Sequence, residues 1–598
     1  MSDAGIPYSK DYWDLVGDQL GKRRSVRFAT VVLVLLYAIA IFAPFLANDR
    51  PLSFTGTDFG EYRGAWRVAG AVANDLSGKL EGGEAGFVTW QAARTERGAT
   101  LEGAALEDWE AAQLEAPTTY AAWLALDREA LALRVTSMRR QLASEHMELL
   151  DELIAVADEA IEVASGATSS SDTAVAEVTV RLGELAGRVR GELRPARYGT
   201  EPEAGRTIAL QPFTSYPVLE SLSWGEVYFM LLWIGVMSWP IWNRLVNRLL
   251  LGGVRNRIRS ARRPKVAAVV LLPLLGVIGF ELLHGTSESD FQTSSIKEAL
   301  TADQARSESV LFAPIAFGMA EQHPAEQFRG PTWVAGASLD EEGFFPGEER
   351  VDGQGLTLHR TPVDVRIGEA DRNAAARHPL GADSLGRDLL ARMVWGGRIS
   401  LSVGIISTVL LVLIGTIMGS LAGYFGGWVD LVISRVIEIF QCFPVFFLIL
   451  IVVSFVGPSV INIMLAIGVF RWTGVARLVR GEFIRLRGSD FVVASQALGV
   501  RSGRVIFRHV LPNALGPVLV AATFAVASGI LTESALSFLG FGVKLPIPSW
   551  GSLLNESASP EHWWIQVFPG VAVFVTVILY NLVGEGVRDA LDPRLKEA

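Results

Sequence analysis

The sequence predicts an all-α membrane protein with about eight transmembrane helices and a large extracytoplasmic helical insertion. Half of its 598 residues are hydrophobic and 19% are charged, below the roughly 25% charged residues of soluble domains. The mean hydropathy is +0.33. Several apolar runs reach the roughly 20 residues that an α-helix needs to cross a bilayer, and long polar stretches separate some of them.

The first apolar run covers residues 28–47 and ends before Asp49 and Arg50. Basic residues cluster just before it, which by the positive-inside rule places the N-terminus in the cytoplasm. We therefore expect residues 1–27 to form a cytoplasmic N-terminal segment and residues 28–48 to form the first transmembrane helix. The basic residues are Lys22, Arg23, Arg24 and Arg27.

A polar insertion, residues 49–223, follows the first span and is expected on the extracytoplasmic side. Apolar residues recur with helical spacing over about 101–198, and the run GATSSSD at 166–172 interrupts them. We expect an antiparallel helical hairpin in about 101–198. Two interpretations stay open for it, a solvated decoration of the membrane protein and a docking surface for a soluble partner.

An extra transmembrane hairpin is predicted at 224–284, with apolar runs at Trp224–Trp242 and Val266–His284. The loop between them, 243–265, carries eight Arg and Lys residues and no acidic residue. Such a loop beside two spans is typical of the cytoplasmic side of a membrane. We expect this basic loop to be cytoplasmic.

Residues 285–398 are again polar and are expected to form a second extracytoplasmic segment, and residues 399–598 are largely apolar. One apolar stretch, 511–541, is too long for one straight span, so we expect part of it to form an interfacial or re-entrant turn. Eight spans result, and an even number places the C-terminus in the cytoplasm with the N-terminus. The apolar stretches of this part lie at about 399–424, 437–456, 460–479, 511–541 and 567–583.

Several classes of function are disfavoured by composition and motifs. The net charge of −10 argues against nucleic-acid binding, because phosphate contacts need a basic face. The single cysteine, Cys442, excludes an intrachain disulfide and a zinc site built from several cysteines. No phosphate-binding Gly-Lys-Ser/Thr loop, His-Glu-x-x-His or Gly-x-Ser-x-Gly motif is present. We expect no enzyme activity, cofactor or metal in this chain.

The segment 485–513 has the pattern of a short helix, a glycine and a second helical turn. Residues Ser489–Leu498 predict a helix with Ser489 or Asp490 as N-cap and Gly499 as its end. A second helical turn starts at Ser502. Its apolar ridge and basic flanks suit insertion into a groove on a cytosolic partner.

At these residues the sequence resembles the inner-membrane permease subunits of ATP-binding-cassette importers. The resemblance is to the oligopeptide/dipeptide type, second ("C") kind, and it covers about 378–598 and the first span. It implies a six-helix permease core, to which 224–284 adds two helices. The matching segments are HPLGADSLGRDLLARMVWGGRISLSVG (378–404), LAGYFGGWVDLVISRVIEIFQCFP (421–444), DFVVASQALG (490–499), IFRHVLPN (506–513), ESALSFLGFGV (533–543), PSWGSLL (548–554) and NLVGEGVRDALDPRL (581–595).

The resemblance implies that the 490–512 loop forms coupling helices that receive motion from ATP-binding subunits. The family signature there begins Glu-Ala-Ala, where this chain has Val493, Ala494 and Ser495. The implied partners are a second related permease, two cytosolic ATP-binding subunits, an extracytoplasmic solute-binding protein and membrane lipid. The implied coupling residues are Asp490, Phe491, Ala494, Ser495, Ala497, Leu498, Gly499, Arg504, Leu511 and Pro512.

The resemblance predicts a multi-pass subunit of a bacterial inner membrane that forms half of a pathway for peptides or related solutes. Charged residues inside spans are functional candidates, so Glu533 and Arg471 are candidate pathway or gate residues. A second hypothesis is a membrane-anchored sensor or docking receptor that uses the helical insertion. Co-purification with an ATPase and a second permease would favour transport over this receptor.

Overall fold

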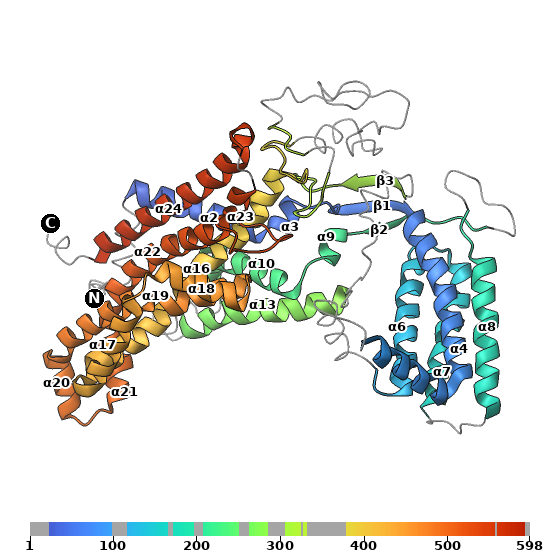
Figure 1. Ribbon diagram of the computed structural model, residues 1–598, viewed down its shortest axis with the longest axis horizontal. Helices are drawn as coiled ribbons and strands as arrows, with labels where there is room; N and C mark the ends of the chain where they lie inside the picture. The colour runs from blue at the N-terminus through green and yellow to red at the C-terminus, as the bar shows by residue number, and fades with distance from the viewer. Residues whose placement is uncertain are drawn as a thin grey trace, which may run out of the picture.

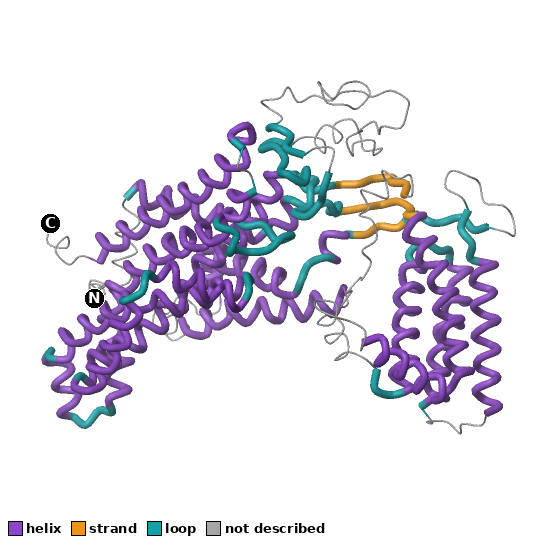
Figure 2. Tube along the Cα trace, viewed as in Figure 1, coloured by secondary structure: helices purple, strands orange, loops and turns teal. Residues whose placement is uncertain are grey.

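The chain is described from a computed structural model, shown in Figure 1. The structure describes residues 23–98, 117–165, 172–196, 207–249, 262–284, 305–323, 327–331, 378–556 and 559–591. Long helices form one elongated body, and a separate bundle of helices lies at its far end, with a small sheet between the two (Figures 1 and 2).

Five described helical segments are long and apolar enough to cross a membrane. Three of them are single helices, α2 (Arg24–Ile41), α16 (Leu389–Phe425) and α19 (Val460–Arg487). The fourth, Ser502–Phe538, is mostly α22 (Leu511–Phe538). The fifth, Pro560–Leu591, joins the turn η4 (Pro560–His562) to α24 (Trp563–Leu591).

A sixth span results if a bent pair of helices crosses the membrane as one unit. Helices α17 (Gly427–Gln441) and α18 (Val445–Val456) are bent by 80° at the short break between them. Pro444 lies directly before α18, where a residue without a backbone N–H is tolerated.

Of the interfacial or re-entrant turn predicted within 511–541, the re-entrant alternative is wrong, and only residues 539–541 of this stretch lie outside the helix. Helix α22 runs without interruption from Leu511 to Phe538, and the sharp bend lies in the 427–456 region instead. A long apolar run can be accommodated by extending or tilting a helix, so its length alone does not require a turn.

Glycines allow α16 and α19 to pack closely. Gly415, Gly419 and Gly423 follow one another at intervals of four along α16, which places them on one face. A Cβ atom on Gly415 would lie 2.7 Å from Cβ of Val475, and one on Gly423 would lie 2.5 Å from Cβ of Phe483. Small residues at this spacing let helix backbones approach inside a membrane.

In the described part of the N-terminal insertion four helices form a bundle, and the two-helix hairpin predicted over about 101–198 accounts for only part of it. The bundle consists of α4 (Phe59–Gly98), α6 (Tyr120–Arg139), α7 (Met147–Ala164) and α8 (Asp172–Glu192), with the turn η1 (Ser144–His146) before α7. Helix α4 escaped prediction because Ala65, Ala69 and Ala73 supply much of its buried face, and such small side chains give a weak apolar pattern. The stretches 99–116 and 166–171, which include most of the predicted turn, lie outside the described residues.

A three-stranded antiparallel sheet connects the bundle to the long helices. Strand β1 (Ser53–Asp58) is central and pairs with β2 (Phe213–Ser215) and with β3 (Ala305–Leu311). In register, Gly56 lies opposite Phe213. Since β1 leads into the bundle and β2 follows it, the two ends of the bundle segment lie side by side.

The predicted extra hairpin contains two shorter apolar helices. Helix α10 (Trp224–Met237) follows the turn α9 (Pro217–Glu220) and packs against α13 (Arg262–His284). The short helices α3 (Ala43–Leu46) and α11 (Trp239–Leu249) follow α2 and α10. Arg398 of α16 donates to Glu226 of α10 at 2.5 Å, so this hairpin is attached to the permease body.

Parts of other predicted segments also fall outside the described residues. They include residues 1–22 of the predicted cytoplasmic segment 1–27, residues 250–261 of the basic loop 243–265, most of the segment 285–398, and residues 557–558 and 592–598 of the segment 399–598.

Candidate functional site

The 485–513 loop has the helix–glycine–helix form that the sequence predicts. Helix α20 (Asp490–Ala497) begins after the N-cap Ser489, and α21 (Ser502–Val505) follows it. A π-helical turn, η3 (Ile506–Val510), then leads into α22. Helices α20 and α21 lie at the end of the long helices that is far from the sheet and the bundle (Figure 1).

Gly499 ends α20 in a left-handed conformation with φ of 73°. The N–H of Gly499 donates to the carbonyl oxygen of Gln496 at 2.9 Å, and the N–H of Val500 donates to that of Ser495 at 3.1 Å. This pair of bonds is the Schellman motif, which satisfies the last carbonyls of a helix and favours glycine. The glycine therefore determines the angle between the two loop helices.

One face of the loop is anchored in the permease body. Val492, Val505, Ile506 and Val510 are buried in a cluster that includes Phe483 of α19. This burial attaches α20 and α21 to the long helices.

Polar contacts join the loop to α16, and α19 to α17, at this end of the body. Gln496 donates to the hydroxyl of Tyr424 at 3.2 Å, at the end of α16. Arg480 of α19 donates to Asp430 of α17 at 2.7 Å. Three helices are thus linked at the loop end of the body.

The opposite face of the loop is exposed and partly apolar. Leu498 is 84% exposed and Phe507 is 69% exposed. Of the sequence-predicted coupling residues, Ser495 and Leu511 are half-buried. The exposed ones are Asp490, Phe491, Ala494, Ala497, Leu498, Gly499, Arg504 and Pro512. An apolar ridge of this kind can fit a groove on a partner protein.

Glu533, a predicted pathway or gate residue, is buried among hydroxyl groups. Ser400 of α16 donates to Glu533 Oε2 at 2.9 Å, and Ser537 donates to its Oε1 at 2.7 Å. The carboxyl group therefore faces the contact between α16 and α22. Hydrogen bonds of this kind compensate for the desolvation of a polar group inside a membrane protein.

Arg471, the second predicted pathway or gate residue, reaches from α19 to α22. It donates to the carbonyl oxygen of Ser528 at 3.0 Å and to the hydroxyl of Thr532 at 2.8 Å. Glu533 is part of α22 and contacts α16, whereas Arg471 is part of α19 and contacts α22 close to Glu533.

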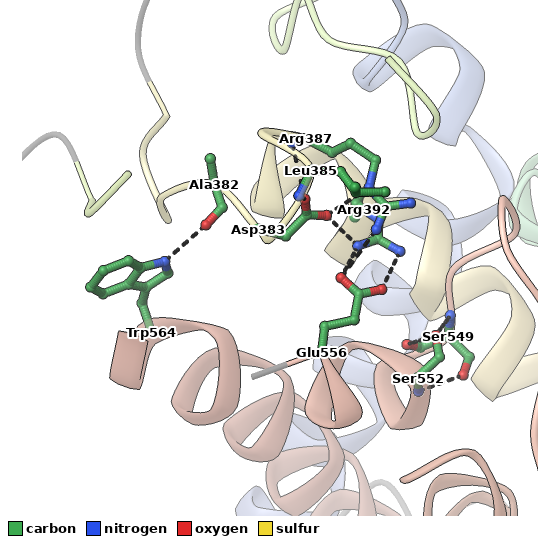
Figure 3. A network of polar contacts seen from close by, with 9 residues as sticks. All are labelled: Ala382, Asp383, Leu385, Arg387, Arg392, Ser549, Ser552, Glu556 and Trp564. Atoms are coloured by element: carbon green, nitrogen blue, oxygen red, sulfur yellow. Dashed lines mark hydrogen bonds and ion pairs between the residues drawn. The ribbon is translucent and has the colours of Figure 1, made fainter. Parts of the chain in front are cut away.

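A buried ionic network at the start of α16 was not predicted from the sequence. Arg387 donates to Asp383 at 2.8 Å and to Glu556 at 3.2 Å. Arg392 donates to Glu556 Oε1 at 2.7 Å and also bonds Asp383. Figure 3 shows both guanidinium groups converging with the two carboxylates. Two positive and two negative groups leave the network neutral.

Neighbouring groups fix the loop that carries this network. Asp388 caps α16 by accepting from the N–H of Ala391 at 2.6 Å, and it contacts His378 Nδ1 at 2.8 Å. Trp564 of α24 donates to the carbonyl oxygen of Ala382 at 3.1 Å. The spacing of charges in HPLGADSLGRDLLAR was a signal for this site, but Glu556 is distant in sequence and could not be paired with it.

The described part of the chain contains no group of three or more His, Cys, Asp or Glu side chains arranged to hold a metal ion.

A family model described as a binding-protein-dependent transport system inner membrane component matches residues 415–597. The dipeptide transport system permease protein DppC of Alkalihalophilus pseudofirmus is 41% identical over 224 residues, covering 37% of this chain and 74% of that protein. The oligopeptide transport system permease protein OppC of Escherichia coli K12 is 45% identical over 219 residues, covering 36% and 72%.

A third relative, the glutathione transport system permease protein GsiD of Pectobacterium atrosepticum, is 39% identical over 235 residues. These cover 39% of this chain and 76% of that protein. The same assignment is supported by the long apolar helices, by the exposed loop at one end, and by the sequence identity over most of each relative. The chain belongs to the family of binding-protein-dependent transport system inner membrane components.

Proposed function

We propose that this protein is one transmembrane subunit of an ATP-driven importer for peptides or related solutes. The observation that carries the proposal is its identity of 41% and 45% to dipeptide and oligopeptide permease proteins. The exposed 485–513 loop supports it, since an importer subunit without an ATP site needs a surface on which an ATPase can act.

The proposed topology has eight spans, with α10 and α13 added to the six that the core supplies. The loop and the bundle lie at opposite ends of the long helices (Figure 1), so they are proposed to lie on opposite sides of the membrane. Basic residues surround the loop, which supports a cytoplasmic position for it. Arg23, directly before α2, and Asp589 of α24 form an ion pair at 2.5 Å, which supports placing these two helix ends on the same, cytoplasmic side.

In the proposed mechanism, two cytosolic ATPases hold this loop and the corresponding loop of a second permease. Closure of the ATPases would move α20, whose angle to α21 is fixed by Gly499. The helical segment from Ser502 to Phe538 is continuous, so the displacement would reach the other end of α22. Arg471, which joins α19 to this part of α22, would act there at the gate of the pathway, and Glu533 would hold α22 to α16. A solute-binding protein would deliver the cargo on the outer side.

The exposed apolar side chains of the loop would supply much of the docking energy. Burying one Leu or Phe side chain stabilises a contact by about 1.5–3 kcal/mol. Leu498 and Phe507 are therefore the strongest candidates for contact with an ATPase.

The proposal is tested by expressing the chain with the neighbouring permease, ATPase and binding-protein genes. We expect the ATPases to co-purify with the chain and a peptide-loaded binding protein to stimulate ATP hydrolysis. Leu498→Asp should abolish co-purification, whereas Leu126→Asp on the bundle, where Leu126 is 47% exposed, should not. Purification of the wild-type chain without any ATPase would contradict the proposal.

A further inference from the structure

The short helix α23 (Trp550–Asn555) lies between α22 and α24 and is fixed at both ends. Ser549 caps it by accepting from the N–H of Ser552 at 3.1 Å, and Ser552 in turn accepts from the N–H of Ser549 at 2.8 Å (Figure 3). The helix follows the apolar end of α22, at the end of the molecule that is far from the coupling loop.

The first end of α23 is attached to the hydroxyl groups around Glu533. The N–H of Trp550 donates to Ser400 Oγ at 3.1 Å, and Ser400 Oγ donates to Glu533. The hydroxyls of Ser549 and Ser537 lie 3.4 Å apart. One buried carboxyl group thus connects α16, α22 and the start of α23.

The body of α23 fits against surfaces that only glycine provides. The indole of Trp550 donates to the carbonyl oxygen of Met393 at 3.0 Å. A Cβ on Gly397 would lie 2.9 Å from the Trp550 ring, and a Cβ on Gly551 would lie 2.5 Å from Cα of Ser534. Helix α23 therefore cannot move away from α16 and α22, or rotate, without losing this contact.

The far end of α23 is held by charge. Glu556, directly after the helix, bonds both Arg387 and Arg392. Arg392 and Asp383 are completely buried. Removing Glu556 from this network would leave a positive charge buried without compensation, which strongly disfavours the folded arrangement.

We infer that α23 is a fixed clasp, through which Glu533 and Glu556 hold α16 and α22 as one rigid block during transport. Both glutamates are then positioning residues that act through α23. This inference rests on the proposed transport function and adds to it. Movement would be concentrated instead at the bend between α17 and α18, where Phe443 is 55% exposed.

A removable cross-link tests the clasp in the complete transporter. Ser537→Cys and Ser549→Cys are combined in a Cys442→Ser background, with each single cysteine as a matched control. We expect oxidation to close the pair, because the two hydroxyl oxygens are 3.4 Å apart, and to leave peptide uptake within about twofold of the reduced protein. A tenfold loss that reductant reverses would overturn the inference, as would failure of the pair to close.

The rate of cross-linking gives a readout that does not depend on transport activity. If α16, α22 and α23 form a rigid block, the cross-link should form at equal rates in the resting complex and in the complex trapped with ATP and vanadate. A rate that falls tenfold in either state would show that α23 detaches, and would overturn the clasp. If the reduced protein closes at equal rates yet neither transports peptide nor associates with an ATPase, the clasp holds and the proposed function fails.

Rescue separates positioning from general stability. Glu556→Gln should reduce peptide-stimulated ATP hydrolysis, and closing the 537–549 cross-link in that variant should restore at least half of it. Absence of rescue in a variant that still assembles with both ATPases would contradict a role through α23.

Discussion

The backbone N–H of Val500 donates to the carbonyl oxygen of Ser495 at 3.1 Å, and this bond closes the turn between the two helices of the loop. It forms only because Gly499, between them, has a φ of 73°. Helix α20 and helix α21, which continues through η3 into α22, therefore meet at a fixed angle.

Substitution of Gly499 should separate coupling from folding. A Cβ at Gly499 would meet no atom within 4 Å, so the cost is backbone strain of about 1–2 kcal/mol for a left-handed residue. We expect Gly499→Val to lower uptake per ATP hydrolysed while the protein still reaches the membrane. Gly499→Asn is the control and should retain most uptake, because asparagine tolerates this conformation. Equal uptake by the wild type and the valine variant would contradict the prediction.

The stability of the protein should depend on the net charge of the ionic network more than on the loss of one hydrogen bond. Glu556→Gln leaves two arginines with Asp383, and we expect a loss of unfolding free energy of about 3 kcal/mol. Adding Arg387→Met restores a neutral Asp383–Arg392 pair and should recover more than half of that loss. Thermal unfolding of both variants in detergent measures this. Additive destabilisation in the double variant would rule out charge balance as the cause.

The bundle should be removable as a whole but not in part. Because Gly56 of β1 lies opposite Phe213 of β2, a short Gly-Ser linker in place of residues 59–212 should leave a folded, membrane-inserted permease. Deletion of 101–198 should instead expose Tyr62, Ala69 and Leu76 of α4, which are buried in the bundle, and lower the yield of folded protein. Size-exclusion chromatography of the two deletion variants measures the yield of folded protein. A higher yield from the deletion of 101–198 than from the replacement of 59–212 would contradict this account of the bundle.

Two buried carboxyl groups should make the bundle less stable as the pH rises. Burial raises the pKa of Asp58 and of Glu61, although a hydrogen bond from Ser137 partly opposes it at Glu61. Folding therefore favours the protonated forms. Their contribution is fully present below the unfolded pKa values, about 4, and is lost as the pH rises through the folded values.

Hydrogen exchange of α4 amides in the full chain, from pH 4 to pH 7, measures this effect. Asp58 accepts from the N–H of Glu61 at 2.8 Å, and Asp58→Asn keeps an acceptor there. The double variant Asp58→Asn, Glu61→Gln should show a smaller loss of protection with rising pH than the wild type. An unchanged slope would contradict the prediction.

The loop could be predicted from sequence because the interactions that shape it are local. An N-cap at Ser489, a glycine after Leu498 and a new turn at Ser502 act within a few residues of one another. Its position at the end of the long helices also follows from the order of apolar and basic segments.

Features that depend on distant residues could not be predicted in this way. Glu556 meets Arg392 across 164 positions of sequence, and no local pattern indicates that pairing. Helix α4 is buried largely through alanine, so its length and its three neighbours become apparent only in the assembled bundle. The bend between α17 and α18 depends on packing that an apolar run does not reveal.

The most direct measurement is photo-cross-linking from the loop in the assembled transporter. Leu498→Cys in a Cys442→Ser background, carrying a benzophenone maleimide, places the probe at the most exposed apolar side chain of the loop. We predict an adduct with an ATP-binding subunit, and no such adduct from a probe at Leu126 of the bundle. An adduct with the solute-binding protein, or labelling of this cysteine from outside intact cells, would contradict the account.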